Sequence, residues 1–174
     1  MSDESVKPYQ ALMLGNAALV VMVGFIGGFM LTFSALGHIE LWPLFSLDQG
    51  VPGSTHGWRA AHVGAITNGL LCAMGSFALP FVAEGGARKI VAYGLIFSAW
   101  GNCVFYFFSV FGNTRGLSGG YVEGMGQSNM FDLVAYLGAV SAAAAAIVSL
   151  VLIAVGAFKY AGNNHRDSLH DKKA

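Results

Sequence analysis

The segment that decides the fold is Gly57–Gly69, which has the sequence GWRAAHVGAITNG. It begins a long apolar stretch, yet it contains an indole, a guanidinium, an imidazole and an amide, from Trp58, Arg59, His62 and Asn68. An ionisable side chain inside an apolar helix is unfavourable unless it has a partner, and in membrane helices such residues mark functional sites. The segment therefore predicts an apolar helix that carries a site.

His62 is the residue of this segment best suited to bind a metal. Neutral imidazole is the commonest metal ligand in proteins, and a single histidine is a usual axial ligand of haem iron. We therefore favour haem iron as the partner of His62. The alternative that the residue alone leaves open is a histidine near a helix end, which caps backbone carbonyls or packs at the membrane interface.

The composition is that of a membrane protein. The 174 residues suffice for one domain and are 55% hydrophobic but only 10% charged, whereas soluble domains have about 25% charged residues. The formal net charge is zero, which excludes the basic surface that nucleic-acid-binding proteins carry. Cys72 and Cys103 lie in apolar segments without the spacing of a metal site, which indicates buried thiols.

Four apolar segments are each long enough to cross about 30 Å of hydrocarbon. They lie at about residues 11–36, 58–83, 90–111 and 130–160. The polar stretches between them contain the glycines and prolines that end helices. We therefore predict an all-α fold, an integral membrane four-helix bundle that forms a single domain over residues 1–174 and is surrounded by membrane lipid.

The basic residues indicate how the bundle is oriented, because lysine and arginine gather on the cytoplasmic side of membrane proteins. Only Arg59 and Arg115 fall on one side of the four segments. The residues on the other side are Lys7, Arg88, Lys89, Lys159, Arg166, Lys172 and Lys173. We therefore expect a protein of the bacterial inner membrane with both termini in the cytoplasm, and with His62 toward the outer face.

Polar side chains form a stripe along the third segment. Spacings of four, four, three and four residues place them on one helix face. The members are Ser98, Asn102, Tyr106, Ser109 and Asn113. Polar groups avoid lipid, so this face meets other helices or a cavity. Hydrogen bonds between helices are a sufficient explanation for the two serines. The larger groups of Asn102 and Tyr106 favour a cavity.

The spacing within the second segment suggests a site between subunits. Trp58 and His62 are four residues apart and share a helix face. Asn68 is six residues beyond His62, which rotates it by about 120° around the helix axis. One helix cannot easily aim His62 and Asn68 into the same small pocket. If the site lies between subunits, His62 can face the site in one interface and Asn68 can face the equivalent site in the next interface.

The remaining charged residues have simpler explanations. Asp132 lies in the first turn of the fourth segment, where an acid complements the helix dipole. Arg59 is expected to reach the outer interface or to meet an anion such as a haem propionate. The other histidines, which we expect to be solvated, are His38, His56, His165 and His170.

Two stretches carry a resemblance to a known family. They are VPGSTHGWRAAHVGAITNG at residues 51–69 and WGNCVFYFFSVFGNTRGLS at residues 100–118. Together they resemble the styrene oxide isomerases, which are small four-helix membrane proteins, and the similarity extends over about residues 11–160. The resemblance implies a homotrimer that binds haem b between its subunits and converts apolar aryl epoxides to aldehydes.

The resemblance also implies roles for particular residues. His62 matches the axial haem ligand, and Asn68 and Tyr106 match polar residues of the substrate pocket. The family pattern has an acidic residue two positions before the tryptophan of the third helix, where this chain has Ser98. The further residues that we expect to contact the haem are Trp58, Arg59 and Asn102. Ferric haem would act as a Lewis acid on the epoxide oxygen, and a 1,2-hydride shift would give the aldehyde.

Three other functions are compatible with the same residues. A haem protein could serve as a sensor or redox subunit without isomerase activity, although electron-transfer haems in bundles usually have two histidine ligands and this chain has no second intramembrane histidine. A small transporter could use His62 and Asp132 in a proton path. The chain could also be a structural subunit.

Overall fold

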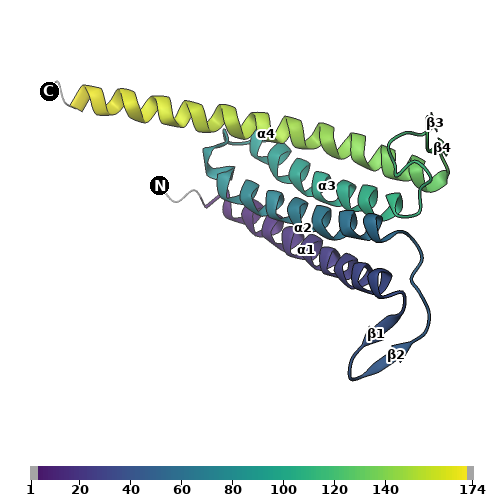
Figure 1. Cartoon of the computed structure of the whole chain (residues 1–174). Helices are drawn as coiled ribbons and strands as arrows, with labels where there is room; N and C mark the ends of the chain where they lie inside the picture. The colour runs from purple at the N-terminus through teal and green to yellow at the C-terminus, as the bar shows by residue number, and fades with distance from the viewer. Residues whose placement is uncertain (1–3, 172–174) are drawn as a thin grey trace.

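The computed structural model describes residues 4–171, and side chains over residues 4–163. It consists of four long helices with two small hairpins (Figure 1). The helices are α1 (Lys7–Leu36), α2 (Thr55–Ala78), α3 (Gly86–Ser109) and α4 (Met130–Asp171). All four are long and apolar enough to cross a membrane. The predicted all-α integral membrane fold is therefore confirmed.

The helices lie side by side, with α1 packed mainly against α2 and α4 packed mainly against α3 (Figure 1). The contact between α2 and α3 joins the two pairs, and α1 also touches α3. Buried residues such as Met13, Cys72 and Leu95 form the core between them. The two cysteines are both buried and free, as expected. Helix α4 is the least covered, so lipid or another protein surface must cover its exposed apolar side chains.

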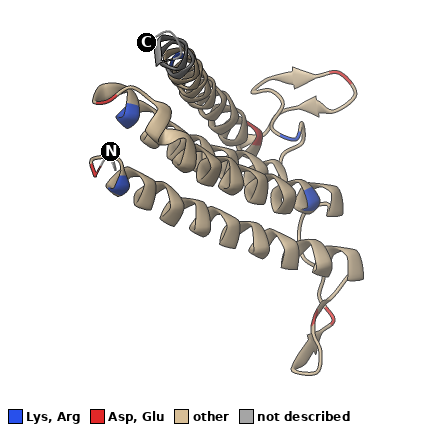
Figure 2. Ribbon diagram, turned by 90° about the vertical axis from the view of Figure 1, so that its left-hand side faces the viewer, with Lys and Arg blue, Asp and Glu red and all other residues tan. Residues whose placement is uncertain are grey.

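Charged residues occupy the two ends of the helices and leave the middle of the bundle apolar (Figure 2). The two hairpins lie at one end, and both termini lie at the other (Figure 1). Arg59 near the start of α2 and Arg115 in the loop between α3 and α4 belong to the hairpin end. Of the residues used to predict the orientation, Lys172 and Lys173 lie outside the described residues. The same applies to the side chain of Arg166 and to the side chains of two histidines, His165 and His170.

The helix ends differ from the predicted ends by a few residues, for local reasons. Helix α2 begins earlier because the hydroxyl of Ser54 accepts a hydrogen bond from the backbone N–H of Gly57 at 3.0 Å and caps the helix. It then gives way to a short 3₁₀ turn at Leu79–Phe81. Helix α4 extends to Asp171 rather than to about residue 160. Hydropathy marks the part of a helix that lies in lipid, whereas this helix continues through a polar tail.

Two hairpins connect the helices at the end opposite the termini. Strands β1 (Ile39–Leu41) and β2 (Phe45–Leu47) pair antiparallel with Ile39 opposite Leu47. Strands β3 (Tyr121–Val122) and β4 (Gly126–Gln127) pair antiparallel within the loop between α3 and α4. The apolar tip of the first hairpin, including Trp42, is exposed. These strands are too short for a periodic pattern, so the sequence did not predict them.

Candidate active site

The imidazole of His62 is held by a backbone carbonyl of the neighbouring helix. Its Nδ1 lies 2.8 Å from the carbonyl oxygen of Gly24 in α1. A carbonyl oxygen can only accept, so Nδ1 carries a proton, and in the neutral imidazole the free lone pair is then on Nε2. Metal-binding histidines commonly use this arrangement, because the bond fixes both the tautomer and the ring orientation. The contact fixes the orientation of the His62 ring and leaves Nε2 as the nitrogen available to a ligand.

A set of glycines in α1 makes room for His62. A Cβ atom at Gly27 would lie 3.0 Å from the backbone nitrogen of His62, and one at Gly28 would lie 2.8 Å from its Nδ1. A Cβ at Gly24 would lie 2.7 Å from the side chain of Ile66. The segment GFIGG therefore lets α1 and α2 approach closely and leaves a slot for the imidazole.

His62 lines a groove of about 520 Å³ on the outside of the α1–α2 pair. Its other walls come mainly from apolar residues of α1, including Phe25, Phe29 and Leu31. Arg59 is exposed and lies one helical turn from His62, toward the hairpin end of α2. Within the described residues, no group of three or more histidine, cysteine or acidic side chains could hold a metal. A metal bound here would therefore need ligands beyond this imidazole.

Asn68 and Asn102 form an interhelical pair. The Nδ2 of Asn102 donates to Oδ1 of Asn68 at 2.8 Å, and it lies 3.4 Å from the hydroxyl oxygen of Ser98. The Nδ2 of Asn68 donates in turn to the carbonyl of Gly64 at 2.8 Å. Asn102, for which we expected a cavity, thus bridges α2 and α3. Ser98 is buried beside it, but its hydroxyl bonds to Asn102 of the same helix, so the hydrogen bond between helices that we expected of Ser98 is not found within the described residues.

Tyr106 occupies a notch in α2. A Cβ atom at Gly64 would overlap the tyrosine ring, so only glycine leaves space for it at this position. The ring of Phe105 lies beside it, with 4.9 Å between the ring centroids. The hydroxyl of Tyr106 has no hydrogen-bond partner within the described part of the chain. A phenol in a membrane bundle is then available to a ligand or to a neighbouring subunit.

Trp58 packs inside the bundle, between α2 and the end of α3. It is 3% exposed, and its Nε1 donates to the carbonyl of Pro52 at 2.9 Å. Its indole meets the rings of Phe107 and Phe111 edge to face, at centroid distances of 6.0 and 5.9 Å. Within a single chain, Trp58 therefore fixes the start of α2 against the end of α3 and the residues that follow it. Its predicted contact with a cofactor stays a prediction.

Asp132 orders the loop before α4. Its Oδ1 accepts from the backbone N–H groups of Thr114 and Gly116 at 3.0 and 2.8 Å, and its Oδ2 accepts from that of Asn129 at 3.0 Å. The carboxylate is completely buried. This confirms the structural explanation for Asp132 as a first-turn acid, because backbone N–H groups occupy both of its oxygens.

The structure separates the candidate residues into two places. His62 faces α1, whereas Asn68, Asn102 and Tyr106 lie at the contact between α2 and α3. This division agrees with the rotation that we expected between His62 and Asn68. No local pattern in the sequence identifies the partner of His62, since Gly24 is 38 residues away. The repeated glycines of GFIGG were the available signal.

Comparison with known proteins identifies the family. The family described as styrene oxide isomerase matches residues 9–158. A styrene-oxide isomerase from Pseudomonas fluorescens is 30% identical over 156 residues, which cover 89% of this chain and 92% of that protein. The matched region contains all of α2 and α3, most of α1 and α4, and every candidate site residue. The chain therefore belongs to the styrene oxide isomerase family.

Proposed function

We propose that this protein is a membrane isomerase that converts aryl epoxides to aldehydes and that it carries haem b on His62. Family membership supports the isomerase activity. The observation that carries the proposal is the bond between Nδ1 of His62 and the carbonyl of Gly24, because it leaves Nε2 as a donor beside an apolar groove.

The residues around the groove fit a haem. The macrocycle is flat and apolar, and the groove beside His62 is lined mainly by apolar and aromatic side chains. Arg59 lies near the membrane surface, where it could meet a propionate. Ferric haem held by one histidine supplies a Lewis acid for an epoxide oxygen. The pair of Asn102 and Asn68 would position the substrate side of the site.

The reaction itself needs no second reactant. The C–O bond at the benzylic carbon breaks, and the aromatic ring stabilises the resulting cation. A hydride then moves with its electron pair from the adjacent carbon to the cationic carbon, while an electron pair of the oxygen forms the C=O bond. All atoms of the epoxide are retained in the aldehyde, so no general base or reductant is consumed.

The chain's own residues would hold the oxygen and exclude water. The hydroxyl of Tyr106 has no partner in the described chain, so it can donate to the oxygen as negative charge develops. Asn68 and Asn102 are already paired with each other, which fixes their side chains before substrate arrives. Phe105 and Phe107 provide apolar surface nearby. A dry site protects the cation from attack by water.

We further propose that the active unit is a homotrimer with the site between subunits. His62 and Tyr106 serve different sides of one chain, so a shared site requires a neighbour. Helix α4 leaves apolar side chains uncovered along much of its length, which also favours association. We propose that the protein lies in the bacterial inner membrane with both termini in the cytoplasm, because Lys7 at the start of α1 and Lys89 in the first turn of α3 lie near the terminal end.

The test is a spectrum and an assay on the same purified protein. We expect a Soret band and conversion of styrene oxide to phenylacetaldehyde, and we expect His62→Ala to lose both. His38→Ala is the control, because that histidine bonds to Glu40 in the first hairpin and lies outside the bundle. Full turnover by His62→Ala would refute the proposal. Haem binding without turnover would instead favour the sensor or redox function.

A further inference from the structure

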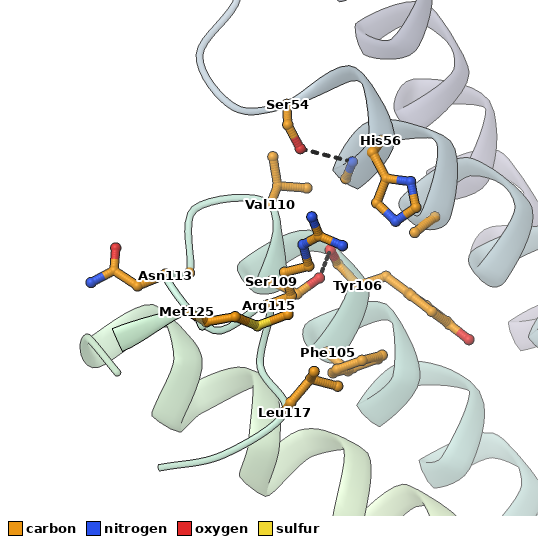
Figure 3. A pocket seen from close by; sticks show the side chains of 13 residues that line it. Ser54, His56, Phe105, Tyr106, Ser109, Val110, Asn113, Arg115, Leu117 and Met125 are labelled. Carbon is orange, nitrogen blue, oxygen red and sulfur yellow. Dashed lines mark hydrogen bonds between the residues drawn. The ribbon is translucent and has the colours of Figure 1, made fainter. Parts of the chain in front are cut away.

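A second cavity lies at the hairpin end of the bundle, and His62 is not among its lining residues. It has a volume of about 470 Å³, which is within the range of small-molecule sites. The start of α2, the end of α3 and the loop between α3 and α4 enclose it (Figure 3). The proposed function assigns two of its lining residues, Tyr106 and Phe105, to the epoxide, so this cavity adjoins the proposed substrate site.

The cavity is basic at its mouth and has no acidic residue in its lining. Arg115 and His56 both line it, and Figure 3 shows the guanidinium of Arg115 pointing into it. Neither side chain has a hydrogen bond or an ion pair within the described part of the chain. No aspartate or glutamate is among the lining residues. A carboxylate is the group that would complement a guanidinium at this position.

The backbone of Arg115 has a conformation that is uncommon for any residue other than glycine. Its φ is 55°, in the left-handed region that favours glycine. The backbone N–H groups on both sides of it, from Thr114 and Gly116, donate to the same buried oxygen of Asp132. An unfavourable backbone conformation that the surrounding structure fixes is typical of functional positions. Here its effect is to direct the guanidinium into the cavity.

The rest of the cavity wall is apolar and partly aromatic. It includes the adjacent rings of Phe105 and Tyr106 and the side chains of Leu117 and Met125. Thioether and aromatic groups pack favourably against an aromatic ring. We propose that this cavity binds an aromatic carboxylate, with the carboxylate on Arg115 and His56 and the ring against Phe105 and Met125. This ligand differs from the epoxide in carrying a charge, and the two would share the ring of Phe105; binding of the carboxylate does not require isomerase activity.

Titration calorimetry of the purified full-length protein with phenylacetate tests the proposal. We expect saturable binding of phenylacetate and at least tenfold weaker binding of phenylacetamide, which has the same shape without the charge. Octanoate distinguishes a carboxylate on an alkyl chain from one on a ring and should also bind more weakly. Equal binding of the acid and the amide, or tighter binding of octanoate, would overturn the proposal.

Arg115→Asn removes the charge while keeping the loop, because asparagine tolerates the left-handed conformation. It should weaken phenylacetate binding by about tenfold to a hundredfold, the range for a hydrogen bond to a charged group. Lys89→Gln, which removes an exposed cation at the opposite end, should bind phenylacetate like the wild type. Unchanged binding by Arg115→Asn would refute the proposal. Loss of haem from Arg115→Asn would assign the guanidinium to a propionate and also overturn it.

Discussion

Gly28→Ala should weaken haem binding without replacing any residue that binds the haem. The new Cβ would lie 2.8 Å from Nδ1 and 3.0 Å from Cε1 of His62, whereas ordinary contacts begin at 3.4 Å. The imidazole must therefore shift by about 0.6 Å (3.4 − 2.8) or more. This shift disturbs the 2.8 Å bond between Nδ1 and the carbonyl of Gly24.

The expected size of the effect follows from the role of that bond. Disturbing the hydrogen-bond partner of a metal-binding histidine typically lowers metal affinity by about 10- to 100-fold. This corresponds to about 1.4–2.8 kcal/mol of binding free energy. The assay is a haem titration of the haem-free protein, followed at the Soret band, with thermal unfolding as a check on folding.

Gly15→Ala is the matched control on the same helix. No atom lies within 4 Å of a Cβ at that position. Both substitutions raise helix propensity by up to about 1 kcal/mol, so a difference in haem affinity cannot come from the helix itself. Gly15→Ala should bind haem like the wild type. Equal haem affinity for Gly28→Ala and the wild type would refute the reasoning about His62.

Three further predictions test other parts of the structure. Asp132→Ala leaves three backbone N–H groups without their acceptor and should lower the free energy of unfolding by about 3 kcal/mol or more. The control Glu123→Ala, at an exposed position of the loop before α4, should unfold at the wild-type temperature. Equal unfolding temperatures for the two variants would contradict this role for Asp132. Tyr106→Phe should lower kcat and leave the haem content unchanged. The loss should be smaller than the roughly 10²–10³-fold caused by removing an oxyanion-hole donor, because the iron would stabilise most of the negative charge that develops on the oxygen. An unchanged kcat would exclude Tyr106 from the mechanism. Ser46→Cys in the first hairpin should react with a membrane-impermeant maleimide in cells whose inner membrane is intact, whereas Gly162→Cys near the C-terminus should react only after that membrane is opened. The two native cysteines are buried and should not add to the labelling. The reverse pattern would contradict the proposed orientation.

The sequence predicted the helices well because hydropathy over about twenty residues is a strong signal for a membrane span. It also singled out His62, since an imidazole in an apolar segment is conspicuous. The polar stripe of α3 was predicted as one face, and the structure places Ser98 and Asn102 together on it. These features depend on residues that are close in the chain.

The contacts that complete the site depend on residues that are far apart in the chain. The bond between Asn102 and Asn68 joins residues 34 positions apart, and no local pattern identifies Asn68 as the partner. Trp58 packs inward because it bonds to the carbonyl of Pro52 and contacts the ring of Phe107 in α3. Its spacing of four residues from His62 predicts a shared helix face but does not identify these neighbours. The left-handed conformation of Arg115 arises from Asp132, which follows it by seventeen positions.

The most direct test of the proposed function is the fate of deuterium in styrene oxide labelled with two deuterium atoms on its terminal carbon. A 1,2-hydride shift moves one deuterium to the benzylic carbon and leaves the other on the aldehyde carbon. Mass spectrometry of the aldehyde, taken before enolisation exchanges the benzylic position, should find both atoms retained. An aldehyde that has already lost one deuterium to solvent, or the absence of aldehyde from haem-loaded protein, would contradict the account.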